Sequence, residues 1–297
     1  MKQLLVSAFL CISMLAGAQQ PKPSSGEIRR IEKFPSKYVD ARNIDVWLPA
    51  GYSPAKRYAV VYMHDGQMLF DSTTTWNKQE WMADEVASEL MKQGKIRDII
   101  VVGIWNNDAF RHAEYFPEKA LANIPADRQQ ELLPLLKGGP KADSYLRFLV
   151  TELKPYIDKS FSTLPDQQNT FIAGSSMGGL ISLYAICEYP KVFGGAACLS
   201  THWIGKFNDE SNPIPPAIIE YMQAKLPSPK NHKLYFDYGS KTLDQYYKPW
   251  QLKVDALMQQ KGFTSKSWIT KEFVGEDHSE RAWQRRLHIP FEFLMAK

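Results

Sequence analysis

Runs of apolar residues alternate along the chain with stretches in which the apolar positions recur every three or four residues. Two of the runs, at 58–63 and 99–104, are almost entirely apolar, which is typical of strands that are buried on both faces of a sheet. Between them, the amphipathic stretch 79–93 predicts a helix. Strands of this kind imply that helices cover both faces of the sheet.

The same alternation continues to the end of the chain. Segments 28–34 and 44–48 predict an antiparallel hairpin at one sheet edge. Further strands are predicted at 170–173, 192–199, 233–238 and 267–273, and helices at 143–157 (capped by Asp143), 177–188, 217–224, 250–260 and 282–295. The pattern predicts an α/β fold with a doubly wound, mostly parallel sheet, whose ligands bind at the carboxyl ends of the strands. The long connection 106–139, with a short helix at 128–136, is a candidate lid.

The amino terminus has the features of a routing signal. A positively charged start and an apolar run over 4–16 precede an Ala-x-Ala cleavage site. The run is shorter than the roughly 20 residues that span a bilayer. We therefore expect a cleaved signal peptide over 1–18 and one domain over 19–297, periplasmic or secreted, with no stable membrane insertion. Cys11 lacks the small preceding residues of a lipid-attachment site.

Composition narrows the possible partners. The chain is 44% hydrophobic and 23% charged, with 36 basic and 32 acidic residues and a net charge of +4, so it is a globular protein without the basic tracts that bind nucleic acid. Cys187 and Cys198 are expected to be small buried residues, a disulfide being the alternative. No His-Glu-x-x-His, Cys/His cluster or phosphate-binding glycine loop is present, so we expect neither a metal nor a cofactor.

A candidate nucleophile lies between a predicted strand and a predicted helix. Residues 174–178 read Gly-Ser-Ser-Met-Gly and fit the pattern Gly-x-Ser-x-Gly, with Ser176 at its centre. The strand, turn and helix around it are the context in which this motif exposes a reactive serine. We expect glycine at 174 and 178 because side chains there would collide with the facing strand and helix.

A serine nucleophile needs a base, and the base needs a carboxylate that orients it. On this fold the expected order along the chain is serine, acid, histidine. His278 follows the last strand and is the candidate base, whereas His288 lies within the last helix, where packing or solvation suits it better. Asp244, on the loop after strand 233–238, is the favoured acid, and Asp237, inside that strand, is the alternative.

Other side chains are expected around the nucleophile. Trp105, His202 and Trp203 follow predicted strands and form a candidate aromatic wall for a sugar or phenolic group, although ordinary packing is the alternative. His202 precedes the acid, so a role as a hydrogen-bond donor suits it better than that of the base. Arg111 is expected to pair with Glu114, or alternatively to bind a substrate carboxylate.

Several segments together resemble a known family. They are 45–52 (DVWLPAGY), 62–71 (YMHDGQMLFD), Arg111 with Glu114-Tyr115, 174–179 (GSSMGG) and 275–278 (GEDH). The chain resembles the esterases of the α/β-hydrolase superfamily that include esterase D, feruloyl and acetylxylan esterases of carbohydrate esterase family one, enterochelin esterases and mycolyltransferases. The resemblance implies an oxyanion hole made by the backbone N–H groups of Gln67 and Met177. Gly66 is expected to let the backbone approach the substrate.

These observations favour a serine carboxylic-ester hydrolase that acts through an acyl-enzyme on a small-molecule or carbohydrate ester. A carbohydrate-linked feruloyl or acetyl ester is the first hypothesis. Siderophore ester hydrolysis and acyl transfer to an alcohol are the alternatives within the family. A catalytically inactive binding protein of the same fold is the non-enzymatic alternative, and a peptidase is disfavoured because peptidases of this fold often carry an additional large domain.

Overall fold

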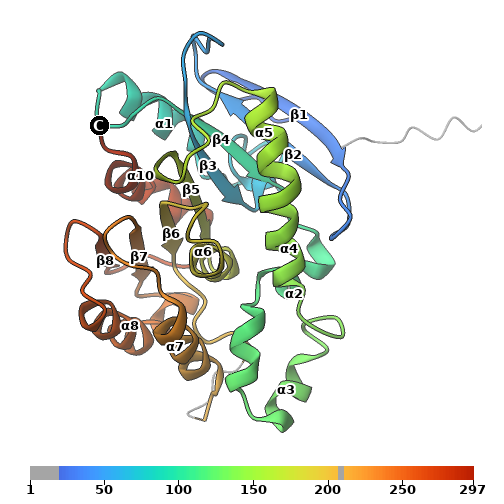
Figure 1. Ribbon diagram of the computed structural model, residues 1–297, viewed down its shortest axis with the longest axis vertical. Helices are drawn as coiled ribbons and strands as arrows, with labels where there is room; N and C mark the ends of the chain where they lie inside the picture. The colour runs from blue at the N-terminus through green and yellow to red at the C-terminus, as the bar shows by residue number, and fades with distance from the viewer. Residues whose placement is uncertain (1–19, 207–210) are drawn as a thin grey trace, which may run out of the picture.

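The computed structural model describes residues 20–206 and 211–297, and their strands form one sheet (Figure 1). The predicted signal peptide over 1–18 lies outside the described residues. The strands are β1 (Glu27–Phe34), β2 (Arg42–Leu48), β3 (Ala59–His64), β4 (Ile99–Ile104), β5 (Thr170–Ser175), β6 (Gly195–Leu199), β7 (Lys233–Gly239) and β8 (Trp268–Phe273). Their order is β1-β2-β4-β3-β5-β6-β7-β8, and β1 with β2 forms the expected antiparallel hairpin at the edge. From β4 to β8 all neighbours are parallel, which confirms the predicted fold class.

Helices cover both faces of this sheet. They are α1 (Ala83–Lys92), α2 (Arg111–Tyr115), α3 (Ala126–Leu132), α4 (Ala142–Phe148), α5 (Lys154–Ser160), α6 (Met177–Glu188), α7 (Ile214–Lys225), α8 (Lys248–Gln260), α9 (Glu280–Arg286) and α10 (His288–Met295). Figure 1 shows α4 and α5 in front of the strands. Helices α4 to α8 contribute to one hydrophobic core, and α1, α9 and α10 to the other.

Strand β3 shows why the central strands are apolar throughout. Val60 and Tyr62 point into the core that α4 to α8 cover, whereas Val61 and Met63 point into the opposite core. Successive side chains of a strand face opposite sides, so a strand between two helical layers needs an apolar residue at every position. This arrangement buries the strand centres and leaves their ends for polar chemistry.

Three local expectations differ from the structure. The last helix is interrupted at Leu287, because Pro290 has no N–H to donate to the carbonyl of Arg286. Asp143 does not cap its helix, since Lys141 occupies the N-cap and the Asp143 carboxylate accepts a hydrogen bond from the Tyr184 hydroxyl. The connection 106–139 is not one loop with one helix but holds α2, α3 and two 3₁₀ turns.

Cys187 and Cys198 are both buried and free, as the favoured alternative predicted. Among the described residues, no helix combines the length and the apolar character that a membrane span requires.

Candidate active site

The carboxyl edge of the parallel strands opens into a pocket of about 570 Å³. Ser176 enters it from the end of β5, Gln67 from the end of β3, Arg111 from α2, and His278 and Trp283 from the chain after β8. The pocket therefore brings together side chains that are more than 200 residues apart in sequence. This is the edge at which a doubly wound sheet is expected to bind ligands.

Ser176 occupies a strained turn between β5 and α6. Its φ of 57° and ψ of −123° lie outside the regions that L-residues ordinarily adopt, and its N–H donates to the Leu199 carbonyl at 3.0 Å. A Cβ atom on Gly174 would lie 2.7 Å from the Gly178 oxygen, so glycine is required there. At Gly178 the nearest atoms would lie at 3.4 Å, which is ordinary contact, and the collision expected at that position does not occur.

His278 and Asp244 are joined by a short contact. His278 Nδ1 lies 2.5 Å from Asp244 Oδ1, and the carboxylate is completely buried. Burial alone raises the pKa of Asp244, but hydrogen bonds from His278, from the Ser200 hydroxyl (2.6 Å) and from the Gly239 N–H (2.5 Å) outweigh it and lower that pKa below its usual value. An ionised Asp244 only accepts, so Nδ1 carries the proton and Nε2 is free to act as an acceptor.

Asp237 lies in the same region but does not contact His278. Its carboxylate accepts hydrogen bonds from Arg286 Nη2 (2.9 Å), from the Ser200 N–H (3.0 Å) and from the Tyr235 hydroxyl (3.0 Å). Ser200 connects the two acids, because its hydroxyl donates to Asp244 and accepts from Arg286 Nη2 at 2.7 Å. Sequence reasoning missed Ser200 and Arg286, since a buried serine and a helical arginine give no signal of their own.

The two predicted oxyanion donors each lie in the first turn of a helical segment. Met177 is the first residue of α6, and Gln67 lies in the 3₁₀ turn Gly66–Met68. The first N–H groups of a helix have no partner within it and carry a partial positive charge. Gly66 is required for a different reason from the expected one, because a Cβ there would lie 2.4 Å from the Gly103 backbone of β4.

The prediction that Arg111 pairs with Glu114 is wrong. Arg111 binds Asp65 through two hydrogen bonds of 2.7 Å, and Glu114 binds Arg42 at 2.7 and 2.8 Å. Burial tends to raise the pKa of Asp65, but Arg111 outweighs it and lowers that pKa. The charge of Arg111 is thus already balanced within the protein, which weakens the alternative that it binds a substrate carboxylate.

The expected aromatic wall is replaced by other aromatic residues. Trp105 donates to Asp45 at 2.8 Å and lies 4.7 Å below the Arg30 guanidinium, whereas Trp203 is 1% exposed and donates to Gln251 at 3.1 Å. Neither of these tryptophans lines the pocket with Ser176. These positions follow strand ends but point into the protein, an outcome that strand position alone does not decide.

Three other tryptophans, Trp76, Trp81 and Trp283, line the pocket instead. Trp76 is 83% exposed on the loop between β3 and α1, and Trp283 packs edge-on against His278 with ring centres 5.0 Å apart. The signal for Trp76 in the sequence is a lone aromatic residue in an otherwise polar segment, 71–80. A large apolar side chain so exposed at a pocket is a candidate contact for a ligand.

His202 lies beneath the nucleophile rather than in the pocket. Its Nε2 lies 2.5 Å from the Gly205 carbonyl, which can only accept, so its Nδ1 accepts from the Tyr247 hydroxyl at 2.7 Å. Burial lowers the pKa of His202 to about 3, so the ring stays neutral. Burial, aided by Asp244, raises the pKa of Tyr247, and the nearby Ser176 side chain opposes the rise only in part. Tyr247 is a further residue that sequence reasoning missed.

The chain is similar to known esterases. The family model described as "Putative esterase" matches residues 38–289. A Bacillus subtilis relative, the ferri-bacillibactin esterase BesA, is 27% identical over 161 residues, 52% of each chain. An endo-1,4-beta-xylanase/feruloyl esterase of Xylanibacter ruminicola is 27% identical over 183 residues, 59% of this chain and 22% of that protein. The match to YjcH of Bacillus subtilis spans 60% of that relative. The chain thus covers less than two thirds of these curated relatives.

Solved structures share the fold at low sequence identity. A ferulic acid esterase superposes with a TM-score of 0.65 at 18% identity over 91% of this chain and 98% of that one. The enterochelin esterase of Shigella flexneri superposes with a TM-score of 0.65 at 15% identity over 93% of this chain and 60% of that one. The order of the strands, the strained serine turn and the extent of the family match lead to one conclusion: the chain belongs to this esterase family and has the α/β-hydrolase fold.

Proposed function

We propose that the protein is a serine esterase that hydrolyses carboxylic esters through a covalent acyl-enzyme. The observation that carries the proposal is the 2.5 Å contact between His278 Nδ1 and Asp244 Oδ1, at a pocket that Ser176 also lines. Nucleophile, orienting acid and base follow one another along the chain in the order that this fold uses. Each of the three residues lies on the loop after a different strand, and this arrangement brings all three to the same edge of the sheet.

In the proposed reaction, Ser176 Oγ attacks the ester carbonyl carbon while His278 Nε2 takes the hydroxyl proton. The N–H groups of Gln67 and Met177 donate to the oxyanion of the tetrahedral intermediate, a contribution worth about 3 to 4 kcal/mol for one donor. His278 then gives the proton to the departing alcohol oxygen. Water, deprotonated by His278, attacks the acyl-enzyme and releases the acid. Asp244 holds the imidazole orientation and stabilises its positive charge.

The substrate that we propose first is a carbohydrate-linked feruloyl or acetyl ester. The exposed Trp76 gives the pocket an aromatic surface, and a flat sugar or phenolic ring is the chemistry that such a surface favours. A siderophore ester is the second candidate, because BesA is named as a ferri-bacillibactin esterase and one structural neighbour as an enterochelin esterase. An alcohol in place of water would make the same acyl-enzyme a transferase.

Export and domain organisation are part of the proposal. We expect removal of residues 1–18 and action of a single domain over 19–297 in the periplasm or outside the cell. The family match over 38–289 supports a single domain. Sequencing the amino terminus of the protein recovered from the periplasm or medium checks this expectation, and an intact Met1 there contradicts it.

The test compares the purified protein with Ser176→Ala on p-nitrophenyl acetate, methyl ferulate and a catecholate siderophore lactone. The proposal expects turnover of at least one ester and a loss of kcat of roughly 10⁴-fold or more in the variant. Turnover of methyl ferulate above the lactone favours the carbohydrate-linked substrate. If the folded wild-type protein is as inert as the variant on all three, a binding role replaces the esterase proposal.

A further inference from the structure

Three carboxylates form a cluster behind the loop that carries Trp76. Glu80, Asp84 and Glu85 each offer one oxygen, and the three oxygens lie within 4.8 Å of one another. Asp84 is completely buried, whereas Glu80 and Glu85 are half-buried. The cluster spans the end of the loop and the first turn of α1. None of its members takes part in the proposed reaction.

Each carboxylate has one oxygen that is shielded from solvent and lacks a hydrogen-bond partner within the described residues. These atoms are Glu80 Oε2, Asp84 Oδ1 and Glu85 Oε2. Asp84 is the decisive residue, because its other oxygen, Oδ2, is already satisfied by the N–H groups of Ser24 (2.7 Å) and Ser25 (3.2 Å). A buried polar atom without a partner is costly, and an ionised one more so. The fold thus holds Asp84 Oδ1 fixed beside two other carboxylates with no group to pair with it.

The described part of the chain supplies no cation to the cluster. Within residues 20–206 and 211–297, no lysine, arginine or histidine nitrogen lies within 4.0 Å of these carboxylates. The three carboxylate oxygens lie within 4.8 Å of one another, so the charges of the ionised groups repel each other. Keeping all three carboxylates ionised at this distance is therefore unfavourable. Either a proton or a bound cation must offset the repulsion.

We propose that Glu80, Asp84 and Glu85 bind a hard divalent cation of the Ca²⁺ class. Ca²⁺ takes oxygen ligands at about 2.3 to 2.6 Å, so ligands on opposite sides of the ion lie roughly 4.6 to 5.2 Å apart, and separations of up to 4.8 Å allow all three oxygens to reach one ion. Ca²⁺ also accepts irregular coordination that water completes. Thiolate- and imidazole-preferring metals find no ligand of their kind in this set.

The site joins parts of the chain that are distant in sequence. Asp84 Oδ2 holds the amino-terminal segment through Ser24 and Ser25, and Asp71 holds the same segment through the Lys22 N–H at 2.9 Å. Glu80 follows Trp76 by four residues on the loop that lines the active-site pocket. A cation here fixes the base of that loop against α1 and against the amino-terminal segment. The role is structural, so it is separate from the proposed ester chemistry.

The test is thermal unfolding of the whole protein after removal of metals with EDTA, followed by addition of CaCl₂ or MgCl₂. The proposal expects CaCl₂ to raise the Tm by roughly 5 °C at a hundred times its Kd. Glu80→Gln and Glu85→Gln should lose this rise. Glu89→Gln is the matched control, because Glu89 lies on the same helix, is exposed and accepts from Gln93 at 2.7 Å. The control should respond as the wild type does.

Two further measurements separate loss of binding from loss of folding. Without metal, Glu85→Gln should be at least as stable as the wild type, because it removes one negative charge from the cluster. Isothermal titration of the wild type with CaCl₂ should give one site per chain, absent from Glu85→Gln. An unchanged wild-type Tm together with no titration heat overturns the proposal and leaves a shared proton as the neutralising partner. An equal Tm rise in wild type and Glu85→Gln overturns it as well, since the ion then binds elsewhere.

Discussion

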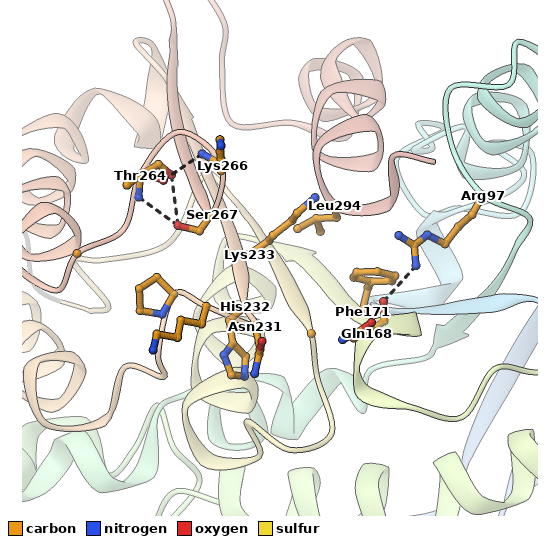
Figure 2. Close-up of a pocket in the computed structure, with 14 residues that line it drawn as sticks. Arg97, Gln168, Phe171, Asn231, His232, Lys233, Thr264, Lys266, Ser267 and Leu294 are labelled. Carbon is orange, nitrogen blue, oxygen red and sulfur yellow. Dashed lines mark hydrogen bonds between the residues drawn. The ribbon is translucent and has the colours of Figure 1, made fainter.

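The two ends of the parallel strands each carry a pocket, but the two are built differently. The carboxyl edge holds the pocket of about 570 Å³ with Ser176 and His278. The amino edge holds one of about 460 Å³, shown in Figure 2, between the starts of β5, β6, β7 and β8. Basic side chains line it, among them Arg97, Lys233 and Lys266. Two of these are already used by the fold, because Arg97 donates to the Ala296 carbonyl at 3.2 Å and Lys233 to the Phe293 carbonyl at 2.9 Å.

The two ends of the strands differ more clearly in backbone strain than in pocket volume. Four residues other than glycine have positive φ just after consecutive neighbouring strands at the carboxyl edge: Asp65 (56°), Ser176 (57°), Ser200 (42°) and Thr242 (50°). Among the residues that line the amino-edge pocket, only Gly262 has a positive φ, which glycine adopts without strain. Strained backbone persists only where surrounding contacts hold it, and it gathers at functional sites. Convergent, strained loops therefore mark the candidate site, whereas a hollow alone does not.

The largest effect is expected from the two acids of the carboxyl edge. Asp244→Asn should lower kcat by roughly 10⁴-fold, because the amide no longer fixes the proton on His278 Nδ1. Asp237→Asn should instead lower stability by about 3 kcal/mol, since it removes the carboxylate that accepts a hydrogen bond from Arg286 and leaves only the more distant Asp244 at 3.9 Å, and it should change kcat little. Ester hydrolysis and urea unfolding of both variants check this. A greater loss of kcat in Asp237→Asn would assign the acid to that residue.

Acid should weaken the carboxyl edge before the rest of the fold. Burial, the largest cause, lowers the pKa of His64 and of His202 to about 3. The unfolded chain takes up these protons near pH 6.5, whereas the folded protein does not. As the pH is lowered from 6.5 to 3, the free energy of unfolding should therefore fall by about 1.4 kcal/mol per pH unit for each histidine. His202→Gln should reduce that slope by the contribution of one proton, which urea unfolding at several pH values measures. An unchanged slope in His202→Gln would contradict the neutral ring.

The smallest effect concerns the rim of the pocket. Trp76→Ala should raise KM for methyl ferulate by roughly tenfold with kcat nearly unchanged, because a stacking contact of about 1 kcal/mol or more is lost without touching the reacting atoms. Lys266→Ala, at the amino-edge pocket, should leave both constants within about twofold. Steady-state kinetics on the two variants measure the difference. An equal effect at both positions would remove the distinction between the two ends.

The fold could be predicted from sequence because burial on two faces demands apolar residues at every strand position, as in β3 and β4. Ser176 could be identified because a strand, a tight turn and a helix leave a local signature. The partners of Arg111 and Glu114 could not, since both pair with residues at least 46 positions away and local spacing carries no information about such contacts. The orientations of the Trp105 and Trp203 side chains could not be predicted for the same reason.

Local sequence predicts the order of strands and helices, the serine turn and the late histidine, because periodicity and turn chemistry act over a few neighbouring residues. Three-dimensional packing sets which aspartate contacts His278, which tryptophans line the pocket, and the proximity of Glu80 to Asp84 and Glu85. These are contacts between side chains on separate elements. These contacts depend on how the sheet and the helices pack, so the tertiary structure sets which side chains become neighbours.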